Sequence, residues 1–427
     1  MSSSMITSLI IFIIAYILIA LETYHKSVVS IVGAVIFISI GYISQDAAFS
    51  SYVDWNVIFL LIGMMIMMGI IKDTGLFQYI AIKLAKLAKG NPIKILLFLF
   101  FATGIISAFL DNVTTIIIMI PISILIAVEL GISPLPFVIS QVLASNIGGT
   151  ATLVGDPPNL MIGSAAGLTF VDFLKNLTPI IFINLAVSAL ILWQVFKKQL
   201  IVSNQKRAKI MEFDEKQVIK KKRDLALGLA VIALFITLFF LHHYTHLEPA
   251  TIALICASIF LLRSRKLKID KFFANEIEWG TILFFVGLFI MVGALQEQGV
   301  INYFSEHVMS LTHGNARLTS IGIVWTSGIA SAIIDNIPFV ATMIPLIENI
   351  GNIMGPDAVK PLWWALSLGS CLGGNGTMVG ASANLIAVSI CNKSGYKISF
   401  LTFTKYGALI AGVNLFISSI YLLLAYH

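Results

Sequence analysis

Two Asp-Asn pairs interrupt long apolar stretches of the sequence, at Asp111-Asn112 and at Asp335-Asn336. If each stretch is a re-entrant hairpin, its tip stops near the midplane of a membrane, where a carboxylate is costly and is retained mainly in ion pathways and proton relays. If each stretch instead crosses the membrane twice, the pairs are surface-loop residues without a special role. We favour the hairpins, because irregular backbone at membrane depth must line a cavity or be buried. We therefore expect Asp111 and Asp335 to couple transport to an ion, H⁺ or Na⁺.

Two glycine-rich segments repeat a second pattern, NIGGTATLVGDPPN from Asn146 and GGNGTMVGASAN from Gly373. Adjacent glycines weaken a helix, and Pro157 and Pro158 suit only the first turn of a new one. Each segment therefore predicts two half-helices that meet inside the membrane, with unpaired backbone groups free to hold ions or substrate. The alternative is a flexible loop or a surface for close helix packing.

The tips and the breaks together predict one central substrate site of amides, hydroxyls, backbone glycines and one further carboxylate. Its candidate residues are Asn112, Thr114, Thr115, Asn146, Gly148, Gly149, Thr150, Thr152, Asp156, Asn159, Asn336, Gly373, Gly374, Asn375, Thr377 and Asn384. No Lys or Arg lies in these motifs, which argues against a site that holds a dianion by charge.

Other candidate residues favour structural roles. Cys371 lies in the second break and could meet a thiophilic substrate, but a lone buried Cys usually acts as a small hydrophobe. His242, His243 and His246 could bind a metal, but they fall in a predicted outer loop and are expected to be solvated. We expect neither a metal site nor a cofactor. The stretch 77–89 is amphipathic and suits a helix at the membrane interface.

The composition is that of a membrane protein. Hydrophobic residues make up 58% of the 427 residues and charged residues 11%, against about 25% charged in soluble domains. Apolar runs of about 17–25 residues match bilayer spans. The first, at 5–21, is expected to be a retained span, because no basic residue precedes it and no small-residue cleavage site follows. The net charge of +6 bears on orientation in the bilayer rather than on nucleic acid.

An internal duplication organises the chain. SAFLDNVTTIIIMIPI from Ser107 matches SAIIDNIPFVATMIPL from Ser331, 224 residues later, and two further blocks match at the same or nearly the same spacing. We expect a first repeat at 1–198, a cytoplasmic linker at 199–223 and a second repeat at 224–427. An odd number of crossings per half makes the repeats inverted, as in many secondary transporters.

The predicted fold is an all-α polytopic membrane protein with about 10 transmembrane helices, two re-entrant hairpins and two broken helices. The first repeat is expected to contain spans at 5–21, 27–44, 55–71 and 172–196, a hairpin at 93–128 and a broken helix at 135–166. The second is expected to contain spans at 224–242, 249–263, 279–295 and 399–425, a hairpin at 316–353 and a broken helix at 362–391.

The distribution of basic residues predicts the orientation. Lys and Arg cluster in 72–94, in the linker, in 263–271, and at Lys393 and Lys397. The positive-inside rule places these segments in the cytoplasm and both termini outside. We expect a multi-pass protein of a prokaryotic inner membrane.

In these motifs the sequence resembles the ion transporter superfamily, in its arsenite permease and melanosomal P protein branch. The resemblance covers nearly the whole chain and implies a scaffold, an elevator-like moving domain and often a dimer. Sodium-coupled dicarboxylate carriers of the superfamily have Ser-Asn-Thr at the tips. This chain has Asp111-Asn112-Val113 and Asp335-Asn336-Ile337 there, which fits coupling through carboxylates better. The chain also resembles Na⁺/H⁺ antiporters of the same group.

These features predict a secondary transporter that exchanges protons for a small solute, with the lipid bilayer and a possible second copy as its partners. Efflux of arsenite or antimonite is the first expectation, because a neutral trihydroxide suits amides and hydroxyls. Na⁺/H⁺ antiport and uptake of a small anion such as a dicarboxylate are the alternatives. A passive channel could use the same motifs. An intramembrane enzyme would need a nucleophile-base pair or metal ligands, which the spans do not offer.

Overall fold

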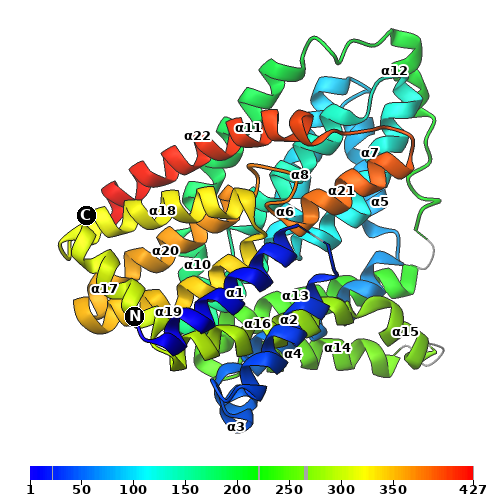
Figure 1. Ribbon diagram of the computed structural model, residues 1–427. Helices are drawn as coiled ribbons and strands as arrows, with labels where there is room; N and C mark the ends of the chain where they lie inside the picture. Colours follow the sequence, from blue (N-terminus) through cyan, green and yellow to red (C-terminus); the bar gives the residue numbers. More distant parts are fainter. Residues whose placement is uncertain (22, 220–221, 264–267, 427) are drawn as a thin grey trace.

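A computed structural model describes residues 1–21, 23–219, 222–263 and 268–426. Lys220, Lys221 and the segment 264–267, all counted above as basic regions, lie outside the described residues, as does the side chain of His243. The described residues fold into helices and contain no strand (Figure 1), which confirms the all-α prediction.

The helices of the first half follow the predicted spans closely, and further short helices lie between them. They are α1 (Ser3–Ala20), α2 (Lys26–Ser39), α3 (Gln45–Ala47), a π-helix (Ala48–Tyr52), α4 (Trp55–Lys72), α5 (Leu76–Leu87), α6 (Pro92–Phe109), α7 (Asn112–Leu130), α8 (Leu135–Gly149), α9 (Pro157–Ala166), α10 (Phe170–Asn176) and α11 (Thr178–Phe196).

The linker contributes one helix and the second half ten. They are α12 (Asn204–Met211), α13 (Lys222–Thr245), α14 (Pro249–Arg263), α15 (Ile269–Glu276), α16 (Trp279–Glu297), α17 (Val300–Thr312), α18 (Ala316–Ile333), α19 (Asn336–Met354), α20 (Pro356–Gly373), α21 (Ser382–Lys393) and α22 (Phe400–Tyr426).

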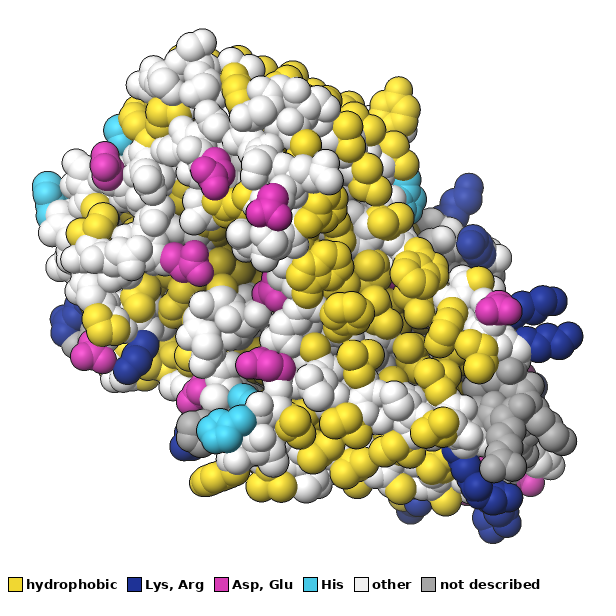
Figure 2. Space-filling model, turned by 90° about the horizontal axis from the view of Figure 1, so that it is seen from below, with side chains coloured by type: hydrophobic (Ala, Val, Ile, Leu, Met, Phe, Trp, Pro, Cys, Tyr) yellow, Lys and Arg dark blue, Asp and Glu magenta, His cyan; other side chains and the backbone are white. Residues whose placement is uncertain are grey.

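Nine of the described helices are long and apolar enough to cross a bilayer, and α2, α8 and α14 are shorter apolar helices. The chain is therefore a multi-pass integral membrane protein. Figure 2 shows a broad area of hydrophobic side chains across one face, with most of the visible Lys and Arg side chains gathered toward one edge. An apolar area of this extent is expected where lipid contacts the protein.

The structure differs from the sequence prediction in two places. First, the second half contains a helix, α17, that the sequence analysis did not identify. It corresponds to α5 in the first half, which is the helix predicted near 77–89. Both begin after a glycine with positive φ, Gly75 at 84° and Gly299 at 78°, a conformation that glycine adopts without steric cost. The predicted span at 172–196 divides at Leu177 into α10 and α11. Pro179 lies at the start of α11, a helix position that proline favours.

The helices form two packed groups. In Figure 1, α2, α4, α14 and α16 lie in the lower part of the view, and α6, α8, α11, α18, α20 and α22 in the upper part. In the lower group α2 packs on α16 and α4 on α14. Small residues allow this approach: an added Cβ at Gly287 would lie 2.5 Å from the Ser30 backbone, and one at Gly63 would lie 2.8 Å from Ala253 Cβ.

Candidate functional site

Each predicted hairpin is a pair of helices joined by a very short turn. Asp111 caps α7, and its carboxylate accepts hydrogen bonds from Val113 N at 3.2 Å and from Thr114 N and Oγ1 at 2.8 and 2.6 Å. Asp335 caps α19 and accepts from Ile337 N at 3.3 Å. These are ordinary N-cap contacts, so local chemistry alone explains why an Asp begins each returning helix.

The two tips meet inside the molecule around Asp156, which is 1% exposed. Asn112 Nδ2 donates to Asp156 Oδ1 at 3.2 Å, and Asn336 Nδ2 donates to Asp156 Oδ2 at 3.3 Å. One carboxylate therefore joins both hairpin tips to the first break. These contacts agree with re-entrant hairpins and not with surface loops. The matching position in the second half of the sequence is Ala381, which has no carboxylate to form the same bridge.

Both breaks occur where predicted, between α8 and α9 and between α20 and α21. An asparagine at the matching place in each break holds the non-helical backbone. Asn159 Nδ2 donates to the carbonyl oxygens of Thr150 at 3.1 Å and Thr152 at 2.8 Å. Asn384 Nδ2 donates to Gly374 O and Thr377 O, both at 2.8 Å. Carbonyls that the helix ends leave unpaired are satisfied in this way.

The threonine hydroxyls of the two breaks also bind backbone. Thr152 donates to Ala108 O at the first tip, and Thr377 donates to Ala332 O at the second. Thr150 donates to the carbonyl of Asn146 in its own helix at 2.8 Å. Thr115 differs: its Oγ1 is buried and has no hydrogen-bond partner among the described residues.

A chain of amides joins the two breaks to each other. Asn146 Nδ2 donates to Asn375 Oδ1 at 2.9 Å and to Asn384 Oδ1 at 2.8 Å. Asn146 Oδ1 accepts from Asn112 Nδ2 at 3.2 Å. Asn375 Nδ2 donates to Leu143 O at 3.3 Å. All four amides are buried, so the first tip and both breaks form one hydrogen-bonded unit.

The predicted glycines allow each broken helix to touch its hairpin. A Cβ at Gly148 would lie 2.0 Å from a carbonyl oxygen of α6, and one at Gly373 would lie 2.4 Å from a carbonyl oxygen of α18. Gly149 packs against Gly155, and Gly374 packs against Gly380. An added Cβ would lie 2.6 Å and 2.9 Å, respectively, from the carbonyl oxygen of that second glycine. These glycines therefore serve close packing rather than presenting backbone to a cavity.

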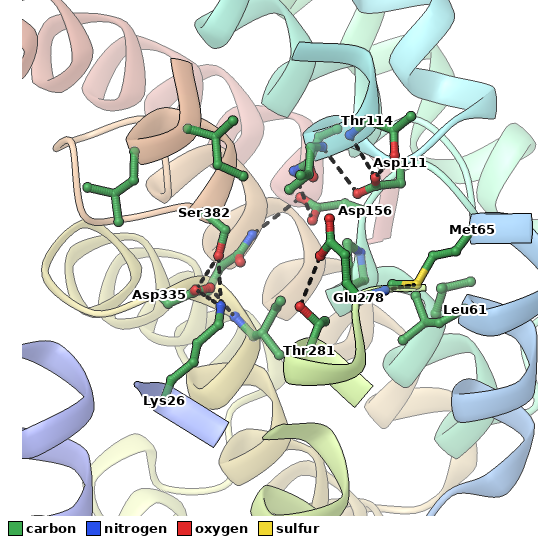
Figure 3. A pocket seen from close by; sticks show the side chains of 18 of the residues that line it. Lys26, Leu61, Met65, Asp111, Thr114, Asp156, Glu278, Thr281, Asp335 and Ser382 are labelled. Carbon is green, nitrogen blue, oxygen red and sulfur yellow. Dashed lines mark hydrogen bonds and ion pairs between the residues drawn. The ribbon is translucent and has the colours of Figure 1, made fainter. Parts of the chain in front are cut away.

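A cavity of about 530 Å³ opens beside the tips, and most of the charged side chains that line it are acidic (Figure 3). Asp111, Asp156 and Asp335 line it together with Glu278, which lies directly before α16 and accepts from Thr281 Oγ1 at 3.0 Å. Asn112, Thr114 and Asn336 also line it. The remaining predicted site residues lie behind this surface, in the network and packing just described.

Lys26, which the sequence analysis did not select, lines the same cavity. Its Nζ lies 3.1 Å from Asp335 Oδ2 and 2.9 Å from Ser382 Oγ. The motifs themselves contain no Lys or Arg, but the assembled site does contain a cation. One signal in the sequence was available: Lys26 is the only Lys or Arg among residues 1–71.

The weaker candidates lie apart from the cavity lining. Cys371 is fully buried, with its Sγ 3.7 Å from Asn159 Oδ1. His242 and His246 line a separate cavity of about 740 Å³ with Glu248. Among the described residues no group of three or more His, Cys, Asp or Glu is arranged to hold a metal.

The chain is similar to known membrane transporters in sequence. Residues 16–369 match a protein-family model described as a citrate transporter. An uncharacterized transporter of Mycobacterium tuberculosis is 41% identical over 426 residues, covering 99% of this chain and 98% of the relative. The P protein of Homo sapiens is 30% identical over 494 residues, covering 96% of this chain and 59% of that protein. The expected resemblance to the P protein branch is thereby confirmed.

Two solved structures share the fold. The YdaH transporter of Alcanivorax borkumensis superposes with a TM-score of 0.57 at 14% identity, covering 91% of this chain and 87% of that one. MtrF of Neisseria gonorrhoeae, whose structure is described as illuminating a class of antimetabolite efflux pumps, superposes with a TM-score of 0.55 at 15% identity, covering 100% and 95%. At these identities the likeness concerns the fold alone.

Proposed function

The chain belongs to the citrate transporter family of membrane transporters, and we propose that it is a secondary active transporter that exchanges protons for a small solute in the cavity beside the hairpin tips. The observation that supports this most strongly is the meeting of Asp111, Asp156 and Asp335 in one cavity. These aspartates come from three separate elements. Carboxylates gathered at membrane depth are typical of ion and proton pathways.

The charge of the cavity supports particular kinds of cargo. Four carboxylates and one lysine line it, so protons or cations must neutralise part of this charge before the site leaves water. A small cation fits this requirement directly, and an uncharged hydroxide such as arsenous acid adds no charge. A bare polyanion such as citrate would enter only with protons or cations to neutralise it.

We assign different roles to the predicted residues. Asp111 and Asp335 are the coupling carboxylates, with Asp156 between them. Asn112, Thr114 and Asn336 contact the cargo from the cavity lining. The other predicted residues shape the site from behind, because their donors bind backbone or one another. Resident cofactors have no place in this proposal, in which H⁺ is the coupling ion and Na⁺ is either cargo or an alternative coupling ion.

Arsenite or antimonite is the first proposed cargo, on the resemblance to arsenite permeases, and export is the proposed direction. Na⁺ is the second proposed cargo, and it is favoured because more carboxylates than lysines line the cavity.

The proposed mechanism is alternating access between two inverted repeats, 1–198 and 224–427, joined by the linker 199–223. Contacts that recur at equivalent positions support the repeats, such as the donors Asn159 and Asn384 in the two breaks. We further propose that the linker is cytoplasmic, that both termini lie outside a prokaryotic inner membrane, and that the group containing the hairpins moves like an elevator against the other, within a homodimer.

The test is a substrate panel in proteoliposomes with a fluorescent pH indicator inside. Arsenite, antimonite, Na⁺, Li⁺, citrate and a dicarboxylate are added one at a time, with and without an imposed pH gradient. The proposal expects one of the inorganic solutes to move uphill at the expense of the gradient and to change the internal pH. Flux that runs only down the solute gradient would indicate a channel. Proton-linked movement of citrate or of the dicarboxylate alone would replace the proposed cargo.

A further inference from the structure

Two cavities occupy matching places in the two halves of the chain. We call them the tip cavity, which Asp111 and Asp335 line, and the second cavity, which has a volume of about 740 Å³. Residues 24–26, where α2 begins, line the tip cavity, and residues 247–249, where α14 begins, line the second cavity. The starts of two helices that lie at matching places in the duplication therefore contribute to different cavities.

Two further pairs of matching residues line the cavities. Thr281 in the first turn of α16 lines the tip cavity, and Val57 in the first turn of α4 lines the second cavity. Leu385 of α21 lines the tip cavity, and its match in α9, Leu160, lines the second cavity. A cavity built from three matching elements is expected to form twice in a duplicated chain, once at each membrane face if the halves are inverted.

A thin apolar partition separates the two cavities. Leu61 and Val154 line the tip cavity, their chain neighbours Leu60 and Leu153 line the second cavity, and Leu160 lines both. Each of these five residues is at most 5% exposed. They belong to α4 and to the first broken helix, and α4 packs against α9. The partition therefore lies where α4, in the lower group of helices, contacts the broken helix that also carries Asp156.

The second cavity reaches the surface and has polar side chains in its wall. Glu248, which lines it, is exposed, and its Oε2 accepts a hydrogen bond from Asn56 Nδ2 at 3.3 Å. Ser164 and Thr169 also line the cavity, from the broken-helix side. A lining of this kind suits water, whereas an apolar constriction such as the partition stops water and ions by dewetting.

We propose that the second cavity is the access pocket of the opposite membrane face, and that the partition closes it off from the hairpin tips in this conformation. Movement of the hairpin group against α4 would open the partition and turn the tips toward the second cavity. In the proposed orientation α16 begins in the cytoplasm and α4 begins outside. The tip cavity then opens inward and the second cavity outward. The inference rests on the proposed alternating access between inverted halves.

The first test is the side from which each cavity can be labelled. The three cysteines of the chain are buried, so a single added thiol can be followed with a membrane-impermeant maleimide. Ser164→Cys should be labelled from outside, in right-side-out vesicles, and Thr281→Cys from the cytoplasmic face, in inside-out vesicles. Ser188→Cys is the matched control, because Ser188 is fully buried in α11 and should be labelled from neither face.

The second test is the partition itself. Leu160→Ala removes the side chain that both cavities share, so it should join them. We expect the leak of H⁺ down an imposed pH gradient in proteoliposomes to rise at least about fivefold. Leu192→Ala makes the same change at a residue of α11 that is 1% exposed, and its leak should match that of the wild type. Each variant is first checked for monodispersity in detergent.

Three outcomes would overturn the proposal: labelling of Ser164→Cys and Thr281→Cys from the same face, absence of labelling in Ser164→Cys, or a wild-type leak in Leu160→Ala. Labelling from opposite faces in the reverse sense would support it and correct the orientation. Neither test requires cargo. A wild type without proton-driven uphill transport would therefore refute the proposed function, while labelling and leak would still decide whether the two cavities open to opposite faces across the partition.

Discussion

Asp156 is the residue whose replacement tests the site most directly. Its two oxygens accept from Asn112 at 3.2 Å and from Asn336 at 3.3 Å. Asp156→Ala removes the acceptor of the Asn336 amide and one of the two acceptors of the Asn112 amide, which keeps Asn146 Oδ1, at about 1–3 kcal/mol for each hydrogen bond lost. We expect Asp156→Ala to lower the free energy of unfolding by about 2–6 kcal/mol.

Asp156→Asn separates the charge from the hydrogen bonds. The retained oxygen can still accept from Asn112, whose amide is also held by Asn146. Within the described part of the chain the Asn336 amide donates to Asp156 alone, so it can turn its own oxygen toward the new amide group. We therefore expect Asp156→Asn to cost about 1 kcal/mol and yet to abolish proton-driven uphill transport.

The assay combines heating in detergent, with the monodisperse fraction measured by size-exclusion chromatography, and uphill flux in proteoliposomes. Asp46→Asn is the control, because Asp46 is exposed on α3 and its replacement makes the same change in charge. The expected order of stability is wild type, Asp156→Asn and then Asp156→Ala, with transport lost in both variants. Wild-type stability in Asp156→Ala would refute the bridge between the tips. Wild-type uphill flux in Asp156→Asn would refute the need for a carboxylate there.

Three further predictions concern other parts of the fold. Asp111→Asn and Asp335→Asn should each abolish proton-driven uphill transport while the protein still inserts into the membrane. Normal uphill flux in both variants would contradict the coupling role. Gly148→Ala should destabilise the protein by about 3 kcal/mol or more, because its Cβ would lie 2.0 Å from a carbonyl oxygen. In the same thermal assay Gly412→Ala, with nothing within 4 Å, should be neutral or stabilising. The hydrogen bond from Lys86 holds the pKa of Glu215 below its usual value. The pair therefore stabilises linker docking at neutral pH and loses that effect as pH falls through the lowered pKa. The protection of α12 amides from hydrogen exchange, corrected for the intrinsic rate at each pH, should accordingly fall in acid, and Glu215→Gln should lower it at neutral pH. Unchanged protection would show that the pair does not hold the linker.

The membrane spans, the hairpins and the breaks could be predicted because their causes are local. Apolar length gives the spans, Pro157 and Pro158 begin a new helix, and Asp111 and Asp335 cap theirs. Each of these signals lies within a few residues of its effect. Because matching segments occur in both halves of the sequence, each of these local predictions was supported twice.

What could not be predicted depends on contacts between distant segments. Lys26 and Asp335 are separated by 309 residues, and no local pattern connects them. The direction in which an amide points is equally invisible in a sequence. Asn159 and Asn384 have the residue type of a ligand, yet the structure uses their donors on the backbone of their own breaks.

Asp156 has a consequence for the energetics of the whole cycle. Two identical halves with inverted orientation would give an outward-open state that mirrors the inward-open one, and the two would be equally populated without a gradient. A carboxylate in one break and Ala381 in the other remove that degeneracy. Under the proposed alternating access, this difference between the two breaks contributes to unequal populations of the two states. Ala381→Asp would place a carboxylate in both breaks.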